Sequence, residues 1–64
     1  MAKDEHNKAA EHHETAAKSH RTAAEHHAKG DHAQGKEHAK AAKQQSQTAH
    51  QHSDEAHTKS QQQK

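Results

Sequence analysis

Histidine is the residue type with the most evident chemistry in this chain, and it supplies eleven of the 64 residues. Four histidines recur at intervals of seven residues: His6, His13, His20 and His27. Neutral imidazole is a good ligand for copper, nickel and zinc, and histidine-rich tracts commonly bind metals. The alternative is that histidine is one more polar surface residue of a low-complexity chain, but the regular spacing favours a ligand role. We expect a divalent transition metal, Cu(II) first and then Ni(II) or Zn(II), in the order of their usual affinities.

The spacing also limits how these histidines can chelate a metal. Two ligands on one helix must lie three or four residues apart, and no two histidines of this chain have that separation. The residues three and four positions from His13 and His20 are all alanine. Histidine ligands must therefore converge from two helices or from two molecules.

Three places look better than the rest of the chain. His26, His27, His32 and His38 bracket the two glycines, and a chain reversal would bring them together. Near the C-terminus, His50–Asp54 and Asp54–His57 have helical chelate spacing and place two imidazoles and a carboxylate on one face. His52–Glu55 is a second pair there, three residues apart. The predicted metal ligands are His13, His20, His26, His27, His32, His38, His50, His52, Asp54 and His57.

The sequence does not suggest an enzyme. Ser19–His20 has no third group to orient it, and no glycine-rich phosphate loop is present. Cysteine is absent, which excludes disulfides, thiolate metal sites and thiol redox chemistry.

The elements that must position these histidines are helices, because alanine, glutamate, lysine and glutamine dominate and proline is absent. Gly30 suits a helix C-terminus, and Asp31 suits the cap of a second helix, which Gly35 could delay to Lys36. We expect an all-α fold, an antiparallel two-helix hairpin in one small domain over 1–64. Its parts are a helix over 4–29, a turn over 30–35, a helix over 32–58 and a frayed tail over 60–64. A break at 44–48, followed by a short last helix, is the alternative.

The seven-residue spacing predicts a coiled-coil-like heptad seam between the helices. We place Ala10, Ala17 and Ala24 at its small position and the four regularly spaced histidines at its large one. The second helix contributes Gly35, Ala42, Ala49 and Ala56, with His38, Gln45, His52 and Lys59 at the large position. One register pairs histidine with small residues: His20 with Ala42, His13 with Ala49 and His6 with Ala56. The other pairs histidine with histidine: His27 with His38 and His13 with His52.

Composition and charge limit the stability and the partners. With alanine as the only repeated apolar residue, we expect a marginal hairpin that could self-associate through the alanine and histidine seam. The net charge of +1 gives no basic field for nucleic acid at neutral pH, and no stretch is apolar enough for a membrane. We expect a cytoplasmic protein as written, or a periplasmic one if Met1 replaces a removed leader.

The stretches "HRTAAEHH" (20–27) and "EHAKAAK" (37–43) resemble the histidine-rich helical repeats of the bacterial small metal-binding proteins. The resemblance covers most of the chain, is compositional, and implies binding of copper or a similar divalent metal through His20, His27 and His38. It implies a role in buffering, storage or tolerance of Cu, Ni or Zn. The competing interpretations are a hydrophilic stress-protective chain similar to the late-embryogenesis-abundant proteins, and a helical interaction module that responds to pH through its imidazoles.

Overall fold

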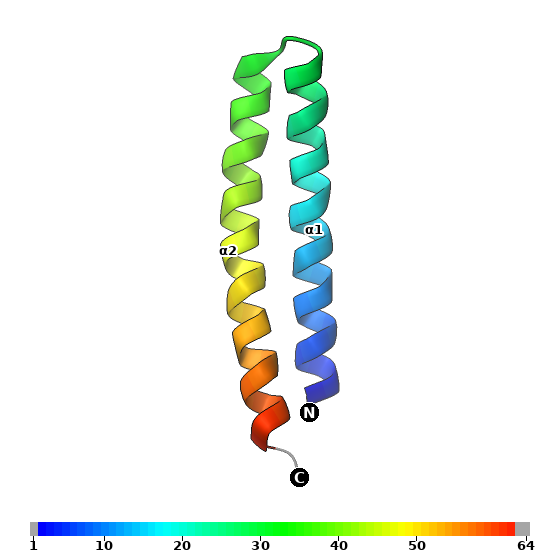
Figure 1. Ribbon diagram of the computed structural model, residues 1–64, viewed down its shortest axis with the longest axis vertical. Helices are drawn as coiled ribbons and strands as arrows, with labels where there is room; N and C mark the ends of the chain where they lie inside the picture. Colours follow the sequence, from blue (N-terminus) through cyan, green and yellow to red (C-terminus); the bar gives the residue numbers. More distant parts are fainter. Residues whose placement is uncertain (1, 63–64) are drawn as a thin grey trace.

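Two antiparallel helices, α1 (Ala2–Ala28) and α2 (His32–Gln62), account for almost all of the chain in the computed structural model, which describes residues 2–62. They run side by side along their whole length, and the first turn of α1 lies at the same end as the last turn of α2 (Figure 1). The hairpin measures 52 × 13 × 10 Å. The predicted all-α hairpin is confirmed. Among the described residues, neither helix combines the length and apolar character that crossing a membrane requires.

The reversal between the helices depends on Gly30 and Asp31. Gly30 has a φ of 82°, a conformation that favours glycine, and its N–H donates to the carbonyl of His27 at 3.0 Å. The N–H of Asp31 donates to the carbonyl of His26 at 2.8 Å, which completes a Schellman motif. The Asp31 side chain then caps α2 by accepting a hydrogen bond from the Gln34 N–H at 3.2 Å. These local signals explain why the chain reverses here.

The helices are longer than the sequence suggested. α1 begins two residues before the predicted start, and α2 begins at His32, so Gly35 does not delay it. α2 also continues unbroken through the polar stretch 44–48 to Gln62. Residues 60–62 of the predicted frayed tail are helical in the structure, and residues 63–64 lie outside the described part. Serine and glutamine cost a helix little, and packing on α1 offsets that cost.

The core is a double row of very small residues. α1 buries Ala2, Ala9, Ala16 and Ala23, and α2 buries Gly35, Ala42, Ala49 and Ala56. Each row repeats every seven residues, and within residues 2–62 no large side chain is fully buried. The apolar area removed from water is consequently small for a chain of this length.

The α2 row is the predicted one, but the α1 row is not. Ala10 and Ala24 are exposed and Ala17 is half-buried, while the preceding alanine of each pair is buried. α1 is thus rotated by one residue, about 100° around its axis, from the predicted orientation. This rotation decides where every histidine of α1 lies.

Candidate metal site

The three histidines at the start of the seven-residue series line one edge of the hairpin, where each meets a serine of α2. The Nε2 atoms of His6, His13 and His20 lie 2.7, 2.6 and 3.3 Å from the Oγ atoms of Ser60, Ser53 and Ser46. The serines also recur every seven residues, in the opposite order along the chain. These three pairs, the His–Ser row, explain the regular histidine spacing as a repeated cross-helix hydrogen bond.

Two further histidine pairs pack directly between the helices. The rings of His12 and His52 are stacked with centroids 4.2 Å apart and planes 6° apart. Those of His26 and His38 are stacked at 4.9 Å and 10°. His12, His26, His38 and His52 are all half-buried. These pairs fill the space beside the alanine rows.

Neither set of predicted pairs is observed as named. The predicted meeting of histidine with histidine does occur at His38 and His52, but their partners are His26 and His12, each one residue before the predicted His27 and His13. His13 and His20 face Ser53 and Ser46 in place of alanine or histidine. The rotation of α1 explains the difference, because it moves the regularly spaced histidines from the seam to its edge. At the edge an imidazole can bond a serine hydroxyl and still contact water, whereas a dry seam would remove its hydration.

His27, the fourth histidine of the series, has a different environment. Its ring covers Gly35 so closely that a Cβ added there would lie 2.7 Å from the ring atoms. Its Nδ1 lies 3.0 Å from the Nδ1 of His32, across the turn. Beside this pair, the Nδ1 of His26 lies 3.3 Å from Oδ2 of Asp31. The turn thus gathers imidazoles from both helices, as the sequence predicted.

The C-terminal candidates remain simple pairs. The Nε2 of His50 lies 3.5 Å from Oδ2 of Asp54, and the Nδ1 of His52 lies 3.8 Å from Oε2 of Glu55. His57 is exposed. Across residues 2–62, no group of three or more histidine or carboxylate side chains is arranged to hold a metal ion.

The orientation of the rings decides which histidine pairs can hold one metal ion between them. The lone pairs of an imidazole lie in the ring plane, so the nearly parallel stacks direct theirs side by side and not toward one point. His27 and His32 are tilted by 40°, and their Nδ1 atoms approach each other. Two nitrogens at 2.0–2.1 Å from one metal, at a right angle, would lie about 2.9 Å apart. The observed 3.0 Å fits two adjacent ligands of one ion.

Glu5 is the residue whose ionisation is most clearly perturbed. Its half-buried position raises the pKa of this carboxyl. A hydrogen bond with the backbone and nearby positive charge, including that of Lys59, lower the pKa by more than burial raises it. The net effect is a pKa below the ordinary 4.5. Glu5 therefore favours its charged form beside the last turns of α2.

The sequence reasoning missed His12 and the three serines of the His–Ser row. The signal for the serines was present, because Ser46, Ser53 and Ser60 recur at the interval of the α1 histidines. No comparable signal marks His12, which directly precedes the regularly spaced His13 but lies outside the seven-residue series. No protein-family model, curated protein or solved structure matches the chain.

Proposed function

We propose that the protein binds divalent transition metal ions at the turn, through the Nδ1 atoms of His27 and His32. The observation that carries this proposal is the 3.0 Å separation of these two nitrogens. Both residues are exposed, so an ion reaches them from solvent without opening the hairpin.

The chemistry of this pair makes metal binding sensitive to pH. At 3.0 Å, one Nδ1 carries a hydrogen and donates it to the lone pair of the other. A metal ion needs the lone pair of both Nδ1 atoms, so this hydrogen moves to Nε2 of its own ring when the metal binds. Protonated imidazole has no free lone pair, so metal binding weakens as the pH falls. Two imidazoles leave the remaining coordination positions to water or to other donors. An open site of this kind suits reversible buffering or tolerance of a metal better than its permanent structural use.

The metal preference should follow ligand chemistry. Two neutral imidazoles at adjacent positions suit Cu(II) best, then Ni(II) or Zn(II). The resemblance to bacterial small metal-binding proteins supports the same class of metal through His27, although it also points to His20 and His38, which make cross-helix contacts.

The test is a titration of metal-free protein with Cu(II) at pH 7.5, followed by calorimetry and by the histidine ring resonances. We expect the rings of His27 and His32 to respond first, and His32→Ala to abolish this response. His57→Ala is the matched control, because it removes an equally exposed histidine of α2 far from the turn.

Two outcomes would reject the proposal. One is an unchanged Cu(II) affinity in His32→Ala. The other is first perturbation of the His50 and His57 rings, which would assign the metal to the C-terminal part of α2.

A further inference from the structure

The second alanine of each Ala–Ala pair in α1 lies outside the contact between the two helices. Ala10 and Ala24 are exposed and Ala17 is half-buried, and together they form a row, the outer alanine row. It lies beside the His–Ser row, because His13 and His20 each come three residues after one of its alanines and four before the next. Side chains this small allow another helix to approach closely. Within residues 2–62, neither helix of the chain covers them.

Charged residues on the same edge of the hairpin indicate what can cover the outer alanine row. Glu14 and Arg21 are exposed and flank the row on the side away from the His–Ser row. On α2, Lys43 and Asp54 are exposed and share one side of the helix, because eleven residues make close to three turns. Lys43 lies on this edge, three residues before Ser46 of the His–Ser row. Each helix therefore presents a pair of opposite charges on this edge.

The two charge pairs are centred at the same level of the hairpin. The midpoint of Glu14 and Arg21 lies between residues 17 and 18, and that of Lys43 and Asp54 lies between residues 48 and 49. Counted from the bond between His13 and Ser53, residue 17 is level with residue 49 and residue 18 with residue 48. One twofold axis at this level would therefore bring Glu14 opposite Arg21, and Lys43 opposite Asp54, of a second copy.

We propose that two copies of the chain associate through this edge, antiparallel to each other, and form a four-helix bundle. The α1 helices pack on each other through the outer alanine row, and the α2 helices lie beside each other. The charges determine the orientation. A parallel copy would place Glu14 against Glu14 and Arg21 against Arg21, whereas the antiparallel copy places opposite charges together on both pairs of helices.

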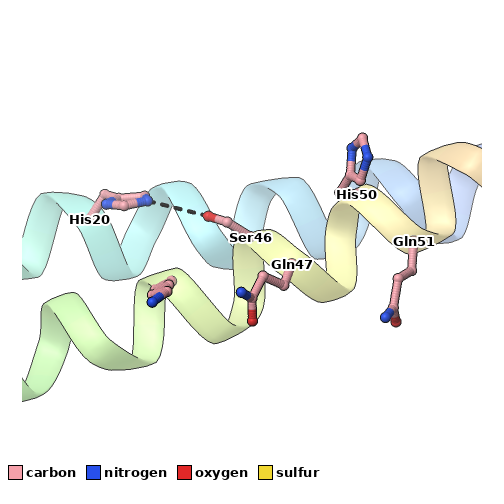
Figure 2. A pocket seen from close by; sticks show the side chains of 6 residues that line it. His20, Ser46, Gln47, His50 and Gln51 are labelled. Atoms are coloured by element: carbon pink, nitrogen blue, oxygen red, sulfur yellow. Dashed lines mark hydrogen bonds between the residues drawn. The ribbon is translucent and has the colours of Figure 1, made fainter.

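A hollow on this edge lies near the proposed axis. It measures about 690 Å³, and its lining residues are His20, Lys43, Ser46, Gln47, His50 and Gln51. Figure 2 shows His20 of α1 reaching Ser46, with Gln47 and His50 on the following turns of α2. The twofold axis sets Gln47 of one copy level with His50 of the other, so the two hollows face each other. Polar side chains of each copy then fill the space that a single chain leaves open.

The association should be weak and specific. Alanine removes little apolar area from water, and exposed ion pairs contribute more to orientation than to affinity. We therefore expect a dissociation constant between about 10 μM and about 1 mM, as for small interfaces.

The experiment is sedimentation equilibrium of the full chain at pH 7.5 and low salt, with a chelator present so that the metal site plays no part. The average mass should rise from 7.1 kDa toward twice that value as the concentration increases from about 10 μM to about 1 mM. Glu14→Arg should weaken the association about tenfold, because it replaces two attractive contacts of the symmetric dimer with two repulsive ones. Circular dichroism at low concentration checks that the variant keeps its helix content.

Two further variants test the pairing itself. Glu14→Arg combined with Arg21→Glu should restore the association, because opposite charges again face each other across the axis. Glu11→Arg is the matched control and should leave the association unchanged. It makes the same change on the same helix, but Glu11 lies about 100° around α1 from Ala10, whereas Glu14 lies about 40° from it.

NMR spectra at increasing concentration locate the interface. The amide resonances of Ala10, Ala17 and Ala24 should shift as the dimer forms, while those of Thr15 and Thr22, on the other edge of α1, should not.

Several results would overturn the proposal. They are a constant mass of 7.1 kDa up to about 1 mM, equal effects of Glu14→Arg and Glu11→Arg, and no recovery in the combined variant. A dimer that forms equally well in Glu14→Arg would use other contacts, such as an exchange of helices between chains. None of these results bears on Cu(II) binding by His27 and His32 at the turn, so the two proposals fail independently.

Discussion

At the scale of single residues, the regularly spaced histidines divide into two chemical groups. The first group is His6, His13 and His20. The Nε2 atom of each makes a hydrogen bond with a serine of the other helix, so these histidines help to hold the two helices together. His27 meets another imidazole, His32, and this pair has the separation of adjacent metal ligands. The same residue type at the same interval thus lies in two environments, and the residue opposite determines which one.

The lengths of the His–Ser bonds predict a graded response to serine removal. Ser53→Ala breaks the 2.6 Å bond to His13 and should lower the free energy of unfolding by about 0.5–1.5 kcal/mol, the usual contribution of one hydrogen bond. Ser46→Ala breaks the 3.3 Å bond to His20 and should cost less. Urea titrations followed by circular dichroism compare the two variants. Equal losses would show that the length of the bond does not set its contribution, and a gain in stability in both variants would show that only the higher helix propensity of alanine matters.

Glu5 predicts one component of the acid sensitivity. A carboxyl whose pKa is lower in the folded chain than in the unfolded one stabilises the fold above about pH 4.5 and loses that contribution as the pH falls. Glu5→Gln should flatten the decrease in stability between pH 5 and pH 3. Glu14→Gln, which removes an exposed carboxylate from the same helix, is the control and should leave the slope unchanged.

At the scale of the elements, the sequence predicted the two helices and their reversal but not the orientation of α1. Gly30 and Asp31 act through contacts with residues close to them in the sequence, so the sequence alone predicts the helix end and the cap that they form. The seam was ambiguous because Ala9–Ala10, Ala16–Ala17 and Ala23–Ala24 offer two equivalent small positions one residue apart. The serines of α2 resolve the ambiguity only when both helices are considered together. The approach of His27 to His32 also depends on this pairing and on the turn geometry.

The two glycines should respond in opposite ways to alanine. Gly30→Ala meets no steric obstacle, but it holds an L-residue at a φ of 82° and should destabilise the hairpin by about 1–2 kcal/mol. Gly35→Ala gains up to about 1 kcal/mol of helix propensity, because the obstructing atoms belong to a ring that can rotate away. That rotation takes His27 from His32, so Cu(II) affinity should fall while stability holds or rises. Thermal melts and copper titrations of both variants test the pairing. Unchanged affinity in Gly35→Ala would show that the ring position does not govern the site.

At the scale of the whole molecule, the core of alanines and one glycine limits cooperativity. Alanine removes little apolar area from water, and the cross-helix contacts are spread over separate layers along 52 Å. Each layer can open near its end of the hairpin without disturbing the others, so helix and hairpin should melt gradually.

The metal-free monomer should therefore show a broad thermal transition at low concentration. Cu(II) at the turn should raise the transition temperature, since an ion held by both helices stabilises the paired state by mass action. Calorimetry with and without metal, repeated in His32→Ala, measures both effects. A sharp metal-free transition above about 70 °C, beyond the usual 45–65 °C of mesophilic domains, would contradict this account of the core.

The turn at Gly30 also determines whether the fold forms from one chain or from two. The contacts between α1 and α2 would be the same if the two helices came from two chains that exchange helices. These contacts are the alanine rows, the stacked imidazoles and the His–Ser bonds. What favours one chain is the short connection, which holds the helices at an effective concentration of about millimolar. A strained turn, as in Gly30→Ala, removes part of that advantage. We then expect a fraction of the chains, larger at higher protein concentration, to form a domain-swapped dimer with the same layers.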